Sequence, residues 1–367
     1  MPSVAERVLG LVEASGLSRR AFGLQIGLDE SKMSKSLSGA RRFSSVDLAR
    51  VADLCHVTVD WLITGDEQPL ATAARTTSGS AGSALDAAKR YSTLRRDMAS
   101  LGYRQPWQPK AVNLGIGGYV EQGRSLAREA LARVAEASHS ITASDHITLV
   151  ENVFGVDVAV VELGAGFDGL AASSADVKLI VLATSQVPAR QRFTLAHELG
   201  HLLAGDDQDV HLDQDVFDKA QAKDPSEMRA NSFASALLMP EDRLRDAVGS
   251  TGLTEHDFAV LACDLVVTPS ALAYRLLHLR LIDAGTCDRY KVLTGARAAS
   301  TASRGEEFAR LVTEAGIPRP PGLLVRDTYA AYESGAATLR PYANLLGADV
   351  DELRHALESE HGTHDAL

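Results

Sequence analysis

Cysteine is scarce in this sequence, and the three cysteines that occur are widely separated. Cys55, Cys263 and Cys287 include no pair in C-x-x-C spacing. A disulfide framework needs an even number of cysteines, and a thiolate zinc site needs closely spaced ones, so the sequence argues against both. The three residues are predicted to be reduced, buried thiols.

Positive charge and long apolar runs are also lacking. Lys and Arg number 37 against 48 Asp and Glu, a net charge of -11, so the chain lacks the basic surface of a general nucleic-acid coat protein. A small local DNA-reading face is still compatible with this balance. Glu6 and Glu13 fall where a signal peptide needs an unbroken apolar core, and Asp157 and Glu162 interrupt the most apolar stretch, 156–163. These features predict a cytoplasmic protein with no membrane partner.

The chain is long enough for several domains, and its amino-acid composition changes along the sequence. Its 367 residues suffice for roughly two to three domains. Residues 1–67 repeat apolar positions at three- and four-residue spacing between glycines, which predicts a compact helical domain. From residue 68 the composition turns to Ala, Thr, Ser and Gly, with TTSGSAGS at 76–83. Residues 68–92 are therefore predicted to be a flexible linker.

Residues 93–285 are predicted to form a mainly helical α+β domain with a small β-sheet. The periodicity predicts helices at 120–138, 143–154, 192–203 and 226–238, and strands at 156–162, 169–173 and 177–183. The pattern of residues at 253–283 is typical of a helix-turn-helix. Its second helix consists mostly of Ala, Leu and Tyr, which are poor at reading bases, so we expect this helix to pack within the protein and not to bind DNA. Residues 286–367 have no assigned role: they could sense a signal, form a dimer or close the domain.

A polar helix in the first domain has the character of a DNA-reading element. In SKMSKSLSG, Met33 and Leu37 lie four residues apart and are expected to face the core. The exposed side is expected to offer hydrogen bonds to base edges in the major groove from Lys32, Ser34, Lys35 and Ser36. Arg41 and Arg42 follow the helix and are placed to contact phosphate.

This stretch resembles the helix-turn-helix of the phage repressor-like (XRE) family, and the likeness covers nearly all of residues 4–65. One departure is Phe22-Gly23, where the family usually shows Leu-Ala. The resemblance implies an all-α domain that binds a double-stranded DNA operator, with a homodimer to double the phosphate contacts. The near-neutral charge of the domain leaves open a protein-interaction module that keeps the fold without reading DNA.

The sharpest motif is RFTLAHELGHLLAG, which places His197, Glu198 and His201 in H-E-x-x-H spacing. Residues four apart lie on one helix face, so both imidazoles can reach one metal ion. Glu198 is then a candidate base that takes a proton from a metal-activated water. Hydrolysis needs a third protein ligand, and Glu227, at the start of SEMRANSFASALLMP, is the candidate.

Here the sequence resembles the ImmA/IrrE family of metallopeptidases, in which a helix of pattern E-x-x-A-N-x-F-A-x-x-L-L-M-P follows H-E-x-x-H. The resemblance implies one zinc ion per chain bound by His197, His201 and Glu227, with Glu198 as the catalytic base. A structural or sensory zinc remains an alternative, because sequence does not show an open ligand position. For stabilising the oxyanion, Tyr119, His211 and Tyr274 are candidates that spacing does not separate.

Together, the motifs predict a bacterial regulator that joins a DNA-binding domain to a zinc endopeptidase. Peptidases of this family typically cleave a repressor protein, so the expected substrate is a repressor or the chain's own linker. Two alternatives remain. One is a transcription factor whose peptidase-like domain only senses zinc or a ligand, and the other is an antitoxin-like interaction protein.

Overall fold

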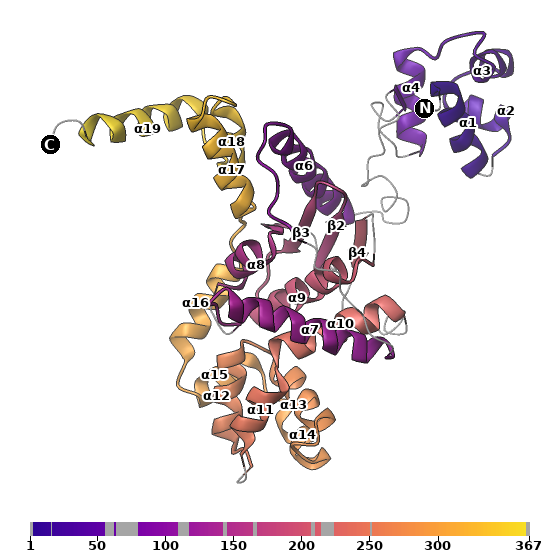
Figure 1. Ribbon diagram of the computed structural model, residues 1–367. Coiled ribbons are helices and arrows are strands. Elements are labelled where there is room, and N and C mark those ends of the chain that lie inside the picture. The colour runs from indigo at the N-terminus through magenta and orange to yellow at the C-terminus, as the bar shows by residue number, and fades with distance from the viewer. Residues whose placement is uncertain are drawn as a thin grey trace. The chain divides into compact units, whose positions relative to one another are not determined.

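The computed structural model describes residues 3–15, 17–55, 62–63, 80–108, 117–141, 145–163, 167–206, 210–213, 224–249 and 252–364. The chain divides into two compact units, Met1–Thr77 and Ser78–Leu367 (Figure 1).

The described part of the first unit is helical, with α1 (Val4–Ala14), α2 (Arg19–Gln25), α3 (Glu30–Leu37) and α4 (Ser45–Cys55). Side chains fix where the short helices begin: Ser18 accepts from the Ala21 amide, and Asp29 accepts from the Lys32 amide at 2.8 Å. Between α2 and α3, Gly27 has φ of +76°, a left-handed conformation that most residues adopt only at a cost. The helices enclose one apolar core that includes Phe22, Ile26, Met33 and Val51.

The second unit is built from many helices around a small sheet. Its described helices are α6 (Ser80–Ser100), α7 (Tyr119–Glu136), α8 (His146–Phe154), α9 (Pro188–Ala204), α10 (Pro225–Leu238), α11 (Glu241–Val248), α12 (Glu255–Leu265), α13 (Pro269–His278), α14 (Ala284–Tyr290), α15 (Gly295–Thr301), α16 (Gly305–Ala315), α17 (Gly322–Glu333), α18 (Arg340–Leu346) and α19 (Val350–His364). The strands are β1 (Asp157–Val161), β2 (Gly169–Ser173), β3 (Lys178–Ala183) and β4 (Val210–Asp213).

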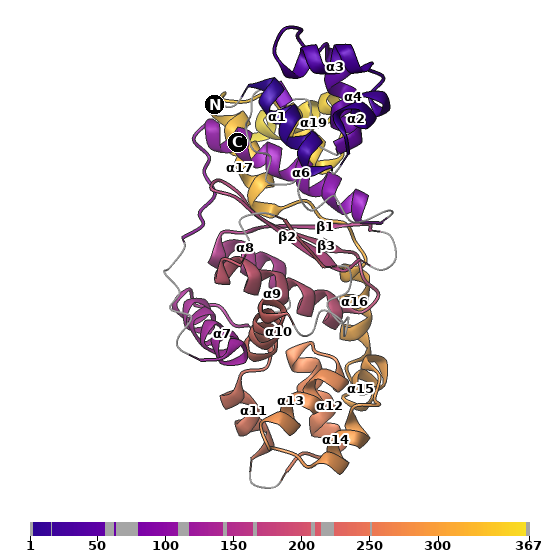
Figure 2. The same ribbon diagram turned by 90° about the vertical axis from the view of Figure 1, so that its right-hand side faces the viewer.

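The sheet has the order β1-β3-β2-β4, with β1 parallel to β3 and β2 antiparallel to both β3 and β4. The first three strands confirm the sequence prediction. The fourth strand is not among the predicted ones: residues 210–213 pair antiparallel with β2. Helices α8 and α9 cover one face of the sheet, and α6 and α17 cover the other (Figure 2).

The predicted linker is wrong over residues 80–92, which form the first half of α6. Ala84, Leu85, Ala88 and Tyr91 are buried and share one helical stripe, which packs toward β2 and β3. Alanine-rich sequence is as favourable for a helix as for a linker, so composition alone could not separate the two. The rest of the predicted linker, 68–79, lies outside the described residues.

One helix boundary and the second helix-turn-helix-like segment can be compared with the sequence. Helix α9 begins at Pro188, four residues before the predicted start, because proline suits the first helical position, where no amide donor is needed. Helices α12 and α13 place Leu272, Ala273 and Leu276 in the main core.

Across the described residues, no single helix is long and apolar enough to span a membrane. In the part of the chain that the structure describes, the pair α12 and α13 taken together has the length and composition for a span, but with a bend of 106° between the two helices.

The described C-terminal residues, 286–364, pack onto the sheet domain through several helices. Helix α15 packs on α12, α16 packs on α9, and α17 packs on α6, α8 and β1. Before α17, Arg319 and Val160 exchange two backbone hydrogen bonds of 2.8 Å beside β1. Of the three roles open for this segment, closing the domain is the one that these contacts support.

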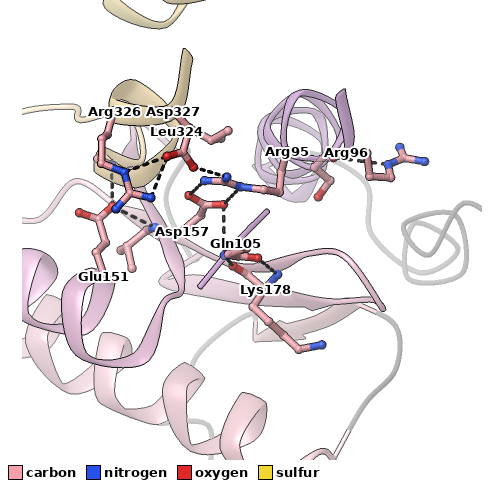
Figure 3. A network of polar contacts seen from close by, with 12 residues as sticks. Arg95, Arg96, Gln105, Glu151, Asp157, Lys178, Leu324, Arg326 and Asp327 are labelled. Atoms are coloured by element: carbon pink, nitrogen blue, oxygen red, sulfur yellow. Dashed lines mark hydrogen bonds and ion pairs between the residues drawn. The ribbon is translucent and has the colours of Figure 1, made fainter. Parts of the chain in front are cut away.

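A buried ionic network joins the segments on both sides of the metallopeptidase-like motifs (Figure 3). Arg95 on α6 binds Asp157 at the start of β1 through Nε at 2.6 Å and Nη2 at 2.7 Å, and Asp327 on α17 through Nη1 at 2.6 Å. Burial raises the pKa of Asp157 above its usual value, against the opposing effect of Arg95. Nearby, Glu151 on α8 accepts from Arg319 Nη2 and the Gly322 amide, both at 2.6 Å.

We expect Arg95→Met to lower the free energy of unfolding of the second unit by about 3 to 5 kcal/mol, because it leaves Asp157 buried without a cation and leaves Asp327 with Arg326 alone. Urea denaturation measures the loss. As a control, Arg245→Met removes an exposed pair with Glu241 on α11 and should change the free energy by at most about 0.5 kcal/mol. Equal effects of the two substitutions would show that the network does not hold α6 and α17 to the sheet.

Candidate functional site

The two predicted metal helices pack directly on each other. Helix α9 is buried along most of its length, including His197, Glu198 and His201, and Glu227 is buried in the first turn of α10. Gly200 makes the close approach possible, because a Cβ atom there would lie 2.8 Å from Phe233 Cδ1. The glycine of H-E-L-G-H therefore lets α10 lie against the face of α9 that carries the histidines.

The three predicted ligands converge. His197 Nε2 lies 3.0 Å from His201 Nε2 and 3.3 Å from Glu227 Oε2. His201 Nε2 lies 3.3 Å from Glu227 Oε1. The three ligand atoms fall within 4.8 Å of one another, and all three side chains are buried.

This donor set fits zinc. Bonds of 2.0 to 2.1 Å in a tetrahedral site separate neighbouring ligand atoms by about 3.3 Å, which matches the distances between the imidazole nitrogens and the carboxylate. Two neutral imidazoles and one carboxylate are also the ligand set of hydrolytic zinc sites, in which the fourth position is left for water or substrate. His197, His201 and Glu227 are therefore a candidate zinc site, as the sequence predicts.

Each histidine is oriented by a hydrogen bond at its other nitrogen. His197 Nδ1 lies 3.2 Å from Asn231 Oδ1, and His201 Nδ1 lies 3.2 Å from Asp206 Oδ2. Nδ1 can donate to these oxygens, which leaves each Nε2 lone pair directed at the metal position. Asp206 also pairs with Arg229, whose Nη1 donates to Gln122 on α7 at 3.1 Å.

Sequence reasoning assigned no role to Asp206 or Arg229. Asp206 lies five residues after His201, beyond the helix, and Gly205 returns it to the histidine because its φ of +68° ends α9 in a left-handed turn. Asn231 belongs to the quoted A-N-x-F-A pattern, which was a signal for it. Nothing in the local sequence marks Arg229, which reaches Asp206 only because α10 packs beside α9.

Glu198 is fully buried beside His197. It precedes His201 by three residues and is not among the three convergent ligands. A buried acid that directly follows a metal-ligand candidate, and is not itself a ligand, is the residue type that a general base requires.

The three oxyanion candidates lie in different surroundings. Tyr119 begins α7, and its ring lies 5.9 Å from Arg229 Cζ, so it is linked through Arg229 and Asp206 to His201. Tyr274 lies on α13 with Lys291 Nζ 5.8 Å from its ring. His211 has only its backbone described, in β4. Tyr119 is therefore the candidate that the described contacts connect to a metal ligand, through Arg229 and Asp206.

In the first unit, the predicted DNA-reading side chains do not all face solvent. Lys32, Ser34 and Lys35 are exposed on α3, as is Arg42 after it. The expectation for Ser36 is wrong: it is buried, and its Oγ accepts from Arg41 Nη1 at 2.8 Å. Position 36 lies three residues after the core residue Met33, so it falls on the inner face of the helix.

Arg41 is less available for a phosphate contact than the sequence predicts, because its Nη2 binds the buried Asp47 at 2.8 Å. This contact ties the turn after α3 to the start of α4. Hydrogen bonds from Ser44 and the bond from Arg41 lower the pKa of Asp47, against the opposing effect of its burial.

We expect one zinc ion per chain, measured by elemental analysis of the purified protein. His201→Ala should lose the metal and lower the melting temperature, because it removes a ligand and leaves buried polar partners unsatisfied. Asp206→Ala and Asn231→Ala keep the ligands but should weaken zinc affinity by about tenfold to a hundredfold. Ser232→Ala is the matched control, since its hydroxyl bonds the Val120 carbonyl instead. Full zinc content in His201→Ala would contradict the assignment.

Comparison with known proteins points to the same helices. Residues 153–277 match the family described as the IrrE N-terminal-like domain. Two curated relatives are each named "Radiation response metalloprotease IrrE". The protein from Deinococcus radiodurans is 35% identical over 136 residues, which cover 36% of this chain and 40% of the relative. The protein from Deinococcus deserti is 34% identical over 167 residues, which cover 41% and 58%.

The chain thus spans 40% of the length of the Deinococcus radiodurans protein and 58% of the length of the Deinococcus deserti protein. The matched region contains β1 to β3 and both metal helices, and it stops before the C-terminal helices from α14 onward. Residues 153–277 are therefore an IrrE N-terminal-like metallopeptidase domain, homologous to the matching parts of these proteins, with His197, His201 and Glu227 as its candidate zinc ligands.

Proposed function

We propose that this chain is a zinc-dependent endopeptidase that relieves gene repression by cleaving a repressor protein, and that its first unit binds operator DNA. The observation that carries the enzymatic part is the arrangement of Glu198. Glu198 is fully buried and directly follows His197 on α9, but it is not one of the convergent ligands. A zinc site that served structure alone would not need a buried acid at this place.

A zinc ion held by His197, His201 and Glu227 would supply a Lewis acid that lowers the pKa of water and polarises the peptide carbonyl. Glu198 accepts a proton from the attacking water at a carboxylate oxygen and passes it to the nitrogen of the leaving amine. Asn231 and Asp206 hold the two imidazoles in the tautomer that presents Nε2, and Arg229 holds Asp206. The chain's residues thereby position the ligands and move the proton.

The substrate we propose is a separate repressor protein. Cleavage of the chain's own linker is a narrower possibility than the sequence suggests, because residues 80–92 belong to α6, and a peptide bond within a helix does not present the extended backbone that a peptidase cleft takes. Self-cleavage would therefore have to fall within residues 68–79.

For the DNA-binding part, the exposed face of α3 gives the support. Lys32, Ser34 and Lys35 point away from the core of their unit, and Arg42 is exposed beside them. Short polar and basic side chains on an exposed helix suit the major groove. Arg41 is better suited to hold Asp47 and Ser36 than to bind phosphate, because both of its terminal nitrogens are engaged.

The test of the enzyme is Glu198→Gln. This substitution keeps the size of the side chain and removes the base, so zinc content should persist while repressor cleavage falls by about a hundredfold or more. Cleavage of repressors encoded by neighbouring genes is followed by gel electrophoresis and mass spectrometry. Glu129→Gln, at an exposed position of α7, is the matched control. If wild type and Glu198→Gln act alike on every repressor and on segment 68–79 with zinc bound, the non-catalytic sensor takes the place of the enzyme.

The test of DNA binding separates base contacts from phosphate contacts. Lys35→Ala should weaken binding to a selected duplex more than to random duplexes. Arg42→Ala should weaken binding to all duplexes and reduce the salt slope by about one. Arg245→Ala, in the second unit, controls for loss of charge. Fluorescence anisotropy at several salt concentrations measures these effects, and failure to select any specific duplex would favour a protein-interaction module.

A further inference from the structure

A cavity of about 340 Å³ lies in the second unit between α9 and α16. Its walls include Arg192 on α9, Arg310 on α16, the start of α8 and Arg319. This volume falls within the roughly 300 to 1,000 Å³ of small-molecule sites. The wall joins the metallopeptidase domain to the C-terminal helices, which lie outside the region matched by the family.

Arg192 is the unusual residue of this cavity. It is only 5% exposed, and its Nη2 donates to the Ile141 carbonyl at 2.6 Å. Its Nε and Nη1 are buried and have no hydrogen-bond partner among the described residues, which also provide no carboxylate to pair with it. Burial, with a smaller effect of Arg243, lowers the pKa of Arg192 to about 9, so the charged form is destabilised where it lies. A buried cation without a counter-ion costs free energy, and a protein rarely keeps one without a use for it.

Arg319 adds a second donor with the same property. Its Nη2 binds Glu151 at 2.6 Å, while its Nη1 is buried with no partner in the described part of the chain. Of the acidic groups of the wall, Asp145 accepts from the Thr148 amide at 2.9 Å, and Glu314 binds Arg310 at 2.7 Å. The unpartnered buried polar atoms of the wall residues are therefore guanidinium nitrogens, which a ligand in the cavity reaches after a small movement of the side chains that cover them.

The remaining wall is largely apolar, and includes Val160, Leu182, Leu195 and Val266. Guanidinium groups bind carboxylate and phosphate oxygens through paired hydrogen bonds. Apolar side chains next to them favour an anion that carries a hydrocarbon portion over a fully hydrated inorganic ion.

The cavity is separate from the metal centre. The residues that α9 gives to it are Pro188, Gln191, Arg192 and Leu195, which share one face of the helix because they lie three, four and seven residues apart. At about 100° per residue, His197 and His201 fall on the opposite side of α9. The cavity thus borders the helix that carries the metal ligands without including any of them.

We propose that this cavity is a binding site for a small organic anion, a carboxylate or a phosphate monoester with a short aliphatic body, held by Arg192 and Arg319. The anion supplies the missing counter-charge, and the apolar wall takes the body. The proposal does not rest on peptidase activity or on DNA binding.

Hexanoate and hexyl phosphate are the probes, and hexanamide is the neutral control of the same length. Isothermal titration calorimetry of the full chain should show binding of at least one anion and none of hexanamide. The stronger of the two anions identifies the head group. Arg192→Met should weaken binding by at least about tenfold, because the charge-assisted hydrogen bonds are lost. Arg245→Met, which removes a charge on α11 outside the cavity, should bind as wild type does.

One further measurement on Arg192→Met and one further variant, Arg310→Gln, separate loss of binding from loss of folding. Without ligand, Arg192→Met should melt at or above the wild-type temperature, since it removes an uncompensated buried charge. Arg310→Gln changes a half-exposed rim residue with little risk to folding and should weaken binding about threefold through loss of charge.

Because an anion could also coordinate a metal ion, the titration is repeated with His201→Ala, in which binding to the cavity should persist. The proposal is overturned if neither anion binds at millimolar concentration, if Arg192→Met binds as tightly as wild type, or if binding disappears with His201→Ala.

Discussion

The close packing of α10 on α9 is the contact on which the candidate metal centre depends. Phe233 lies against Gly200, and this places Glu227 over the two imidazoles of α9. The same helix touches α7, where Gly123 leaves no room for a side chain beside the Ser232 Cβ. A Cβ atom at Gly200 would lie 2.8 Å from Phe233, and one at Gly123 would lie closer still to the Arg229 carbonyl oxygen, so α10 or its side chains would have to shift. The positions of the ligands thus depend on how closely the backbones of α9, α10 and α7 approach one another. The ligand atoms themselves come from three side chains, His197, His201 and Glu227.

Burial explains why the polar groups of this region form chains of partners. A polar side chain in a core needs a hydrogen bond, and each partner then needs one of its own. From His201 this requirement extends to Asp206, Arg229 and Gln122, and so from α9 through α10 to α7. The ligands are therefore held by elements that are far apart in sequence, which gives the site rigidity without a larger number of ligands.

The segments that flank the matched domain are held by a second buried network. Arg95 connects α6 to β1 and α17, and Glu151 connects α8 to the strand-like segment at Arg319. The C-terminal residues therefore form part of the same packed unit as the metal helices. Because the cavity with Arg192 lies where these two parts meet, occupation of that cavity would bear on α9, the helix of both histidines.

The amino-acid sequence was sufficient to predict the candidate metal ligands, the three main strands and the helical character of both units. H-E-x-x-H fixes its geometry within a single helix, so local periodicity was sufficient for the two histidines. Glu227 was indicated by the resemblance of its helix to the metallopeptidase family pattern. The sequence did not determine α6, because an alanine-rich stretch suits a linker and a helix equally, and only packing on the sheet decides between them. The sequence also did not show that Ser36 lies on the inner face of α3 or that Arg229 pairs with Asp206. It did not show that Arg192 is buried without a carboxylate partner among the described residues. These outcomes depend on which helices lie side by side, and that is decided by long-range packing, which no short stretch of sequence encodes.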